Sequence, residues 1–239
     1  MKIKKEITLV SISDIKIKET IKSLLISNKK LNPAKTLLFS SKSIYLNKNE
    51  KKFINVIKIN PISSIRKYSE FIIFSLYKYI STSHVLIVQW DGFIINSKNW
   101  NNDFLKYDYI GAPFIPRDDD KNYSRDDSGG FYSIGNGGFS LRSKKLLAAP
   151  SQLKLKDNFE LTNFHEDGFF SVLQRKYLES KGYKWAPFDT ALKFAIESPL
   201  SFNDLIFLPF GFHGKKIYYL LILNILFKKI FRNNEKKLK

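Results

Sequence analysis

The 239-residue chain contains no cysteine. Disulfides, thiolate metal sites and a cysteine nucleophile are therefore excluded, and the composition is compatible with a reducing cytoplasm. The chain also lacks a membrane-spanning segment, because the apolar residues 217–227 fall short of the about 20 that a spanning helix needs. The N-terminal apolar run ends before Ser11 and Asp14 and is too short for a signal peptide.

Internal repeats and a Gly/Ser linker are absent, and no segment matches a Walker loop, a GxGxxG fingerprint or an EF-hand. Hydrophobic residues make up 44% of the chain and aromatic residues 15%. This content supplies one sizeable core and argues against disorder. We expect one domain at residues 1–214, followed by a basic, apolar tail at 215–239.

Acidic residues are scarce at both ends of the chain. The net charge is +10 over residues 1–60, +1 over 61–214 and +7 over 215–239. Scattered terminal lysines fit an anionic membrane surface at least as well as nucleic acid, which needs a basic stripe with base-reading groups. The tail predicts an amphipathic interfacial helix, with docking on the protein's own core as the alternative. A cytoplasmic protein, peripheral on the inner face of the cytoplasmic membrane, is expected.

Apolar periodicity predicts an alternation of strands and helices in the first part of the chain. Strands are expected at 7–12, 35–39, 53–59 and 84–88, and helices at 13–27 and from Ser63 or Ser64 to about 80. This order is typical of an α/β fold with a mostly parallel sheet and helices on both faces. Further helices are expected at 143–149 and at 165–181, where Gly182 is the C-terminal cap. Residues 117–130 form either a mobile lid or a solvated loop.

Asp91 lies where the predicted strand that begins at His84 would end, and it precedes Gly92. Ligands of open α/β sheets collect at the carboxyl ends of strands. A carboxylate there can hold a metal ion against a phosphate, although an Asp-Gly pair also simply forms turns. His213, flanked by glycines and aromatic residues, could complete such a site, with phosphate and water as the remaining ligands of Mg²⁺ or Mn²⁺. A lone histidine is otherwise a packed or solvated residue.

Two further segments carry candidate chemistry. Gly135, Asn136, Gly137 and Gly138 form a loop whose backbone can approach a sugar or diphosphate closely, or a tight turn. The pair Glu166-Asp167 begins a predicted helix, where acids often only stabilise the helix dipole. The functional alternative is a general base that takes a proton from an attacking hydroxyl.

Six blocks in order carry a resemblance to a known family. They are QWDGF (89–93), YDYIGAPF (107–114), GNGGFSLRS (135–143), HED (165–167), APFDTALKFAIE (186–197) and PFGFHG (209–214). Over residues 84–214 the chain resembles an uncharacterised bacterial family that is regarded as glycosyltransferase-like with a GT-A fold. An ordered run of blocks is far more specific than any one of them. The resemblance implies a GT-A-like, Rossmann-like sheet flanked by helices.

The resemblance also implies roles for single residues. Asp91 resembles the surviving acid of the Asp-X-Asp motif and His213 the late histidine of the metal site, which together would hold Mn²⁺ or Mg²⁺. Gln89 replaces the first acid of that motif, which puts the strength of metal binding in doubt. Asp167 resembles the base of inverting enzymes, and Glu166 would orient the acceptor or the base.

Substrate contacts follow from the same resemblance. The loop Gly135, Asn136, Gly137 and Gly138 would lie against the donor sugar or the acceptor. Asp108 would hydrogen-bond a sugar hydroxyl or, alternatively, satisfy buried backbone.

The implied activity is hexosyl transfer from a nucleotide sugar, with a UDP-sugar as first choice. Inversion through Asp167 is the favoured course, and retention is the alternative because the sequence does not give the face of attack. The acceptor would be a glycan or lipid-linked glycan in lipopolysaccharide, O-antigen or capsule synthesis. One rival is a non-catalytic sugar- or nucleotide-binding domain, which the missing acid at Gln89 motivates. The other is a nucleic-acid-binding protein, motivated by charge alone, and we expect no nucleic-acid partner.

Overall fold

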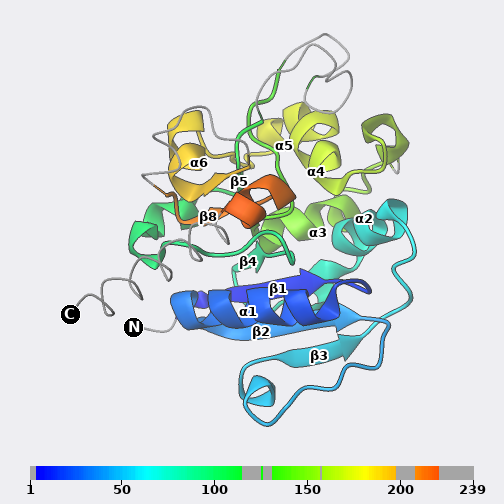
Figure 1. Ribbon diagram of the computed structural model, residues 1–239. Helices are drawn as coiled ribbons and strands as arrows, with labels where there is room; N and C mark the ends of the chain where they lie inside the picture. Colours follow the sequence, from blue (N-terminus) through cyan, green and yellow to red (C-terminus); the bar gives the residue numbers. More distant parts are fainter. Residues whose placement is uncertain (1–3, 115–124, 126–130, 157, 198–207, 221–239) are drawn as a thin grey trace, which may run out of the picture.

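The computed structural model describes residues 4–114, 125, 131–156, 158–197 and 208–220 (Figure 1). The expected lid at 117–130, apart from Arg125, lies outside the described residues. Most of the expected tail helix, residues 221–239, lies outside them as well.

A six-stranded sheet in the order β3-β2-β1-β4-β6-β5 forms the centre of the molecule (Figure 1). Its strands are β1 (Lys4–Ile12), β2 (Pro33–Ser40), β3 (Asn55–Lys58), β4 (His84–Ile87), β5 (Tyr109–Gly111) and β6 (Ser140–Ser143). Three of the five pairings are parallel, and both pairings of β6 are antiparallel. The predicted α/β class with a mostly parallel sheet is therefore confirmed.

Consecutive buried residues in the central strands show that the sheet is covered on both faces. The last six residues of β1 and all four of β4 are buried, without the alternation of a half-exposed strand. The helix α1 (Ile17–Leu31) connects β1 to β2, and α2 (Ile65–Phe74) connects β3 to β4. Because these right-handed crossovers run in opposite directions across the sheet, the two helices cover opposite faces.

The change of direction between β1 and β4 creates a switch point at the carboxyl edge of the sheet, where α/β proteins bind ligands. The antiparallel strand β6 begins at this edge, since it runs against β4. The glycine loop that precedes β6 therefore reaches the carboxyl end of β4. The helix α3 (Lys144–Gln152) then leaves the sheet from the other end of β6, with the Ser143 hydroxyl accepting from the amide of Leu146 as its cap.

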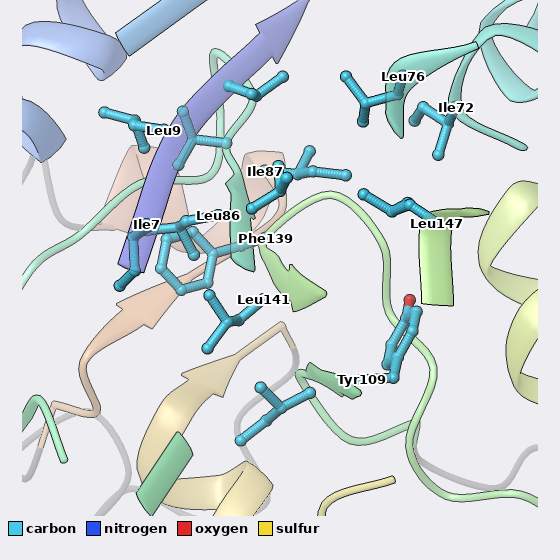
Figure 2. Packing of buried hydrophobic residues seen from close by; sticks show 14 of the residues in the cluster. Ile7, Leu9, Ile72, Leu76, Leu86, Ile87, Tyr109, Phe139, Leu141 and Leu147 are labelled. Carbon is cyan, nitrogen blue, oxygen red and sulfur yellow. The ribbon is translucent and has the colours of Figure 1, made fainter. Parts of the chain in front are cut away.

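Apolar side chains from segments far apart in the sequence meet in one core (Figure 2). Ile7 and Leu9 of β1 and Leu86 and Ile87 of β4 are fully buried there. Further buried members from α2, α3, β5, β6 and the turns beside them are Ile72, Leu76, Tyr109, Phe139, Leu141 and Leu147. Burying one such side chain contributes about 1.5–3 kcal/mol.

The helical region after the glycine loop differs from the single helix predicted at 165–181. It consists of α4 (Glu166–Gly168), a π-helical turn η6 (Phe169–Leu173) and α5 (Arg175–Ser180). The predicted cap at Gly182 is confirmed, with φ of +83°. The amides of Gly182 and Tyr183 donate to the carbonyls of Glu179 and Leu178, the two hydrogen bonds of a Schellman motif.

The remaining elements form the C-terminal part of the described chain. They are α6 (Phe188–Phe194), β7 (Ala195–Ile196), β8 (Gly211–Phe212) and the turns η1 (Glu50–Lys52), η2 (Leu76–Tyr79), η3 (Ser97–Asn99), η4 (Asn102–Lys106) and η5 (Phe159–Thr162). β7 and β8 pair in parallel, and Gly211 bridges to Ile94. This pairing brings residue 213 beside the turn after β4.

The start of the tail is helical at residues 215–220 and contacts the core. Ile217 is 1% exposed and packs with Ile196 and Phe212, while Tyr219 and Leu220 remain exposed. No helix in the described portion of the chain has the length and hydrophobicity needed to cross a membrane.

The periodicity predicted that the first helix begins at Ser13, but α1 begins at Ile17. The reason is that Asp14 is held outside the helix by hydrogen bonds. Its carboxylate accepts hydrogen bonds from the Ser40 hydroxyl, from the amide and hydroxyl of Ser41, and from the amide of Ile62, at 2.6–2.8 Å. Asp14 thus ties the ends of β1 and β2 to the segment before α2. Burial raises its pKa, but these hydrogen bonds outweigh burial and lower the pKa to about 2.

We expect Asp14→Asn to lower the free energy of unfolding by about 1–2 kcal/mol near neutral pH, with partial exposure limiting the effect. The stabilisation by Asp14 is complete above its ordinary pKa of 3.8 and is lost as pH falls through about 2. Urea unfolding of both proteins between about pH 5 and pH 2 measures this. The stability difference should narrow as the pH falls. Asp189→Asn, at an exposed acid on α6, is the control and should show no such pH-dependent difference from the wild type. If the difference between wild type and Asp14→Asn stays constant with pH, the stabilising role of the Asp14 carboxylate is contradicted.

Candidate active site

A cleft of about 580 Å³ lies at the carboxyl edge of the sheet. The ends of β1 and β4 form its floor, so it occupies the predicted switch point. Its lining residues are Ser11–Ile15, Thr20, Ile62–Ile65, Tyr68, Ser69, Val88–Trp90, Asn136, Gly138, His165–Asp167, Glu197 and His213. The sequence therefore places segments from nearly the whole chain around one cavity.

A tight turn after β4 positions Gln89 and Asp91. The amides of Gln89 and Gly92 each donate to the carbonyl of the other, at 2.9 and 3.1 Å. A Cβ on Gly92 would lie 2.9 Å from the His213 ring, so the turn and the histidine can approach only because this residue is glycine. Asp91 is 6% exposed, and its carbonyl accepts from the amide of Gly214.

His213 contacts three polar side chains. Its Nδ1 lies 3.1 Å from Glu197 Oε1, and its Nε2 lies 3.2 Å from Gln89 Oε1 and 3.9 Å from Asp91 Oδ1. Burial alone lowers the pKa of His213, but the Glu197 carboxylate, followed by Asp91 and Asp167, raises it above the ordinary value. The segments around residues 91 and 213, which are distant in sequence, thus meet in space.

The glycine loop before β6 packs directly against these groups. A Cβ on Gly138 would lie 2.1 Å from His213 Nε2, and one on Gly137 would lie 2.4 Å from Glu166 Oε1. The Gly137 amide donates to Asp167 Oδ2 at 3.0 Å. The loop therefore lies between the histidine and the acidic pair, where a side chain at either glycine would collide with one of them.

Glu166 pairs with Arg142 beneath this loop. The guanidinium of Arg142 is fully buried and makes a bidentate pair with the Glu166 carboxylate, with Nη2–Oε1 at 2.9 Å. Arg142 also donates to the hydroxyls of Tyr109 and Ser140. Burial raises the pKa of Glu166, while the positive charge of Arg142 opposes this rise.

Asp167 is 6% exposed and lines the cleft. Its two carboxyl oxygens accept from the amides of Gly168 and Gly137, which fix the orientation of the carboxylate. The chain enters this segment through left-handed backbone at Asn163 and Phe164, with φ of 51° and 61°. Such conformations cost about 1–3 kcal/mol each and are concentrated at functional sites.

Three buried side-chain oxygens have no hydrogen-bond partner within the described part of the chain. They are Ser69 Oγ, Asp91 Oδ1 and Asn136 Oδ1. Ser69 and Asn136 line the cleft, and Asp91 Oδ1 lies beside His213, which also lines it. Unsatisfied buried acceptors are costly, so their presence at one cavity indicates a ligand that supplies hydroxyl groups or a cation.

The cleft is acidic although the protein is basic. Among its described lining residues are the acids Asp14, Glu166, Asp167 and Glu197, but no lysine or arginine. Arg142 neutralises Glu166 from behind the wall. An anionic ligand in this cleft therefore needs neutral donors or a bound cation to offset the carboxylates.

Several predicted contacts lie outside the cleft lining. Asp108 does not line the cleft. Its carboxylate accepts from the Ser143 hydroxyl at 2.5 Å and from the Lys184 amide at 2.9 Å. Asp108 therefore satisfies a backbone amide, which was the alternative to binding a sugar hydroxyl. Gly135 and Gly137 form the loop but do not line the cavity, whereas Asn136 and Gly138 do.

Sequence reasoning missed Arg142, Glu197 and Tyr68 as members of the site. Arg142 lies in the block GNGGFSLRS and Glu197 ends the block APFDTALKFAIE. Each is a charged residue within or at the end of an apolar segment, and this could have marked them as members of the site. Helical spacing puts Tyr68 on one apolar face with Ile72 and Leu76, and nothing in the sequence pattern distinguishes it from a core residue.

The model of a protein family matches residues 51–213, which is more than half of the chain. Its description is "Protein of unknown function (DUF5672)". The chain belongs to this family. The matched region contains the turn after β4, the glycine loop, the acidic pair and His213. Among curated proteins, no match is found.

Solved structures add a likeness at the level of the fold. The chain is similar to a glycosyltransferase involved in the glycosylation of the major capsid of PBCV-1, with a TM-score of 0.51 and 12% identity. That likeness covers 87% of this chain and 91% of the other. This member of the DUF5672 family therefore has a glycosyltransferase-like fold.

A second structure, the mannosyltransferase PcManGT from Pyrobaculum calidifontis in complex with GDP-Man and Mn²⁺, has a TM-score of 0.39 and 8% identity. The likeness covers 62% of this chain and 46% of the other, and we draw nothing from it.

We expect Arg142→Met to lower the free energy of unfolding by about 3–5 kcal/mol, because Glu166 would remain buried without its partner. Arg66→Met is the matched control, since Arg66 pairs with Glu70 at 2.9 Å but is 53% exposed. The control should cost no more than about 1 kcal/mol. Urea unfolding followed by circular dichroism measures both, and equal losses would show that the buried pair is not a stabilising constraint.

Proposed function

We propose that the protein is a glycosyltransferase that moves a sugar from a nucleotide-sugar donor, first of all a UDP-sugar, to a glycan or lipid-linked glycan acceptor. The observation that carries the proposal is that Asp167 and His213 line one cleft of a glycosyltransferase-like fold, with Asp91 Oδ1 3.9 Å from His213 Nε2. Bacterial surface polysaccharides, such as lipopolysaccharide, O-antigen or capsule, are the proposed product class.

Asp167 is the proposed general base. Its carboxylate is fixed by two backbone amides and faces the cleft, so it can accept the proton of an acceptor hydroxyl as that oxygen attacks the anomeric carbon. The new carbon–oxygen bond forms as the bond to the diphosphate breaks, and the leaving diphosphate takes the electron pair. Attack opposite the leaving group inverts the anomeric centre. Glu166, held by Arg142, fixes the position of Asp167 relative to the glycine loop.

A divalent cation fits the residues beside the cleft. Asp91 Oδ1 is buried and unpartnered in the described part of the chain. It lies 3.9 Å from His213 Nε2, which in turn lies 3.2 Å from Gln89 Oε1. Neighbouring ligands of Mg²⁺ or Mn²⁺ lie about 3 Å apart when the bonds are about 2.1 Å long. When bound, the cation would neutralise the leaving diphosphate.

Two features set the strength of that cation site. In the described part of the chain, no three acidic or histidine side chains gather at metal-ligand spacing. A cation would therefore rely on the neutral Gln89 amide, phosphate oxygens and water in addition to Asp91 and His213. Because the cleft is acidic, the cation would also be attracted by the surrounding carboxylates before the donor binds.

The rival functions are weaker on the same observations. A sugar-binding domain without activity would use the Asp167 carboxylate only to accept hydrogen bonds from sugar hydroxyls, and it leaves the buried, unpartnered Asp91 Oδ1 beside His213 without a role. Nucleic-acid binding requires basic and stacking groups, and the described lining of the cleft carries carboxylates instead.

We also propose that the tail binds the anionic inner face of the cytoplasmic membrane. Residues 221–239 carry six basic residues and one acid, and their sequence begins with the apolar stretch 221–227, which follows the helical residues 215–220. Ile217 docks on the core, which would place the basic continuation close to the domain. A lipid-linked acceptor would then be presented near the cleft.

Asp167→Asn should lower the rate of sugar transfer or donor hydrolysis about 10²- to 10⁴-fold, because the amide cannot accept the proton. Thermal-shift screening against nucleotide sugars, with and without Mn²⁺, first identifies the donor. Release of the nucleotide diphosphate is then measured for both proteins. Asp103→Asn, at an exposed acid paired with Lys106 outside the cleft, should behave as wild type. Equal turnover by Asp167→Asn would refute its role as base.

Truncation after Leu220 should abolish cosedimentation with anionic vesicles while circular dichroism stays native, because the truncated chain retains Ile217. Binding of the full chain should weaken with salt, since surface electrostatic attraction is screened. If the truncated protein sediments as well as the full chain, another surface is responsible.

A further inference from the structure

The Gln89 side chain contacts two other residues that line the cleft, Tyr68 and His213. Its Nε2 donates to the Tyr68 hydroxyl at 3.0 Å, and its Oε1 faces His213 Nε2 at 3.2 Å. A carboxylate at this position could not donate to the phenol. The replacement of the first acid by glutamine therefore creates a hydrogen bond that an acid would not make in its ionised form.

This hydrogen bond leaves the proton of Tyr68 available. The phenol oxygen is already the acceptor for Gln89, and within the described residues its hydroxyl makes no other hydrogen bond. A tyrosine hydroxyl has one proton to donate, and Tyr68 lines the cleft. Burial and the nearby carboxylates of Glu166 and Asp167 raise the pKa of Tyr68, so the proton stays on the phenol.

The neighbouring residue on α2 points to the same conclusion. Ser69 also lines the cleft, is 0% exposed, and its hydroxyl has no partner in the described part of the chain. α2 thus presents two hydroxyl groups whose protons have no acceptor among the described residues, in a cavity whose described lining carries no lysine or arginine. Neutral donors are what an oxygen-rich anionic ligand would need there.

We propose that the Tyr68 hydroxyl donates a hydrogen bond to an oxygen of the bound nucleotide sugar, and that Gln89 is the positioning residue that directs it. This inference rests on the proposed function, because it takes the nucleotide sugar as the ligand. Tyr68 lies between Gln89, beside the candidate cation site, and the acidic pair. The acceptor oxygen is therefore on the diphosphate or on the transferred sugar.

Isothermal titration in Mn²⁺ tests the contact, with UDP and with the UDP-sugar that stabilises the wild type most. Tyr68→Phe should bind the UDP-sugar at least about tenfold more weakly, the usual effect of one hydrogen bond to a charged oxygen. A matching loss with UDP alone assigns the contact to the diphosphate, and a loss only with the UDP-sugar assigns it to the sugar. Tyr79→Phe, whose ring packs on Phe39 away from the cleft, should bind as wild type.

Gln89→Glu tests the positioning role. Its carboxylate would accept the phenol proton, so Tyr68→Phe should cause little further loss of UDP-sugar affinity in this background. Such non-additivity separates positioning through Tyr68 from an independent effect of Gln89. Additive losses would overturn the role of Gln89.

Unchanged affinity of Tyr68→Phe, in a wild type that binds, would overturn the contact while leaving the proposed function intact. A wild type that binds no nucleotide sugar in the thermal-shift screen would instead refute the proposed function, and the inference with it.

Discussion

The buried ion pair between Arg142 and Glu166 is the constraint on which the arrangement of the site depends. It joins β6 to the start of α4, and the glycine loop closes over it so tightly that Gly137 has no room for a Cβ. Removing two charges from water is costly, and only a bidentate geometry with further hydrogen bonds offsets that cost. Arg142 has those further bonds, to Tyr109 and Ser140. The direction of the neighbouring Asp167 carboxylate follows from this fixed geometry.

Charge is distributed unevenly between the ends of the chain and the cleft. The termini carry nearly all of the net charge of +18, while the described lining of the cleft is acidic. Long-range attraction to anionic surfaces and local attraction for a divalent cation can therefore coexist in one molecule. Within the cleft, the neutral Gln89, Tyr68 and Ser69 would complement a cation without adding to the charge.

The sequence was sufficient for the fold class and for most of the central strands, because continuous apolar runs bounded by turns have few other interpretations. It was also sufficient to select Asp91, Asp167 and His213 as candidate site residues. Asp91 follows a predicted strand, Asp167 begins a predicted helix, and His213 interrupts an aromatic segment. The sequence could not reveal Arg142 or Tyr68 as members of the site. Arg142 acts through a partner 24 positions away, and Tyr68 occupies a position that helical periodicity assigns to the core. The break in the helix predicted at 165–181 was equally hidden, because a π-helical turn preserves apolar residues on the buried side.

That π-helical turn has a consequence for how the acidic pair can vary. A π turn holds about one residue more than an α turn, and one residue of an α-helix corresponds to a rotation of about 100°. With α5 fixed by its contacts and its Gly182 cap, loss of one residue from 169–173 would let the helix continue regularly but would rotate Glu166 and Asp167 away from Arg142 and the cleft. The orientation of the proposed base is therefore encoded in the length of this segment more than in the identity of its side chains.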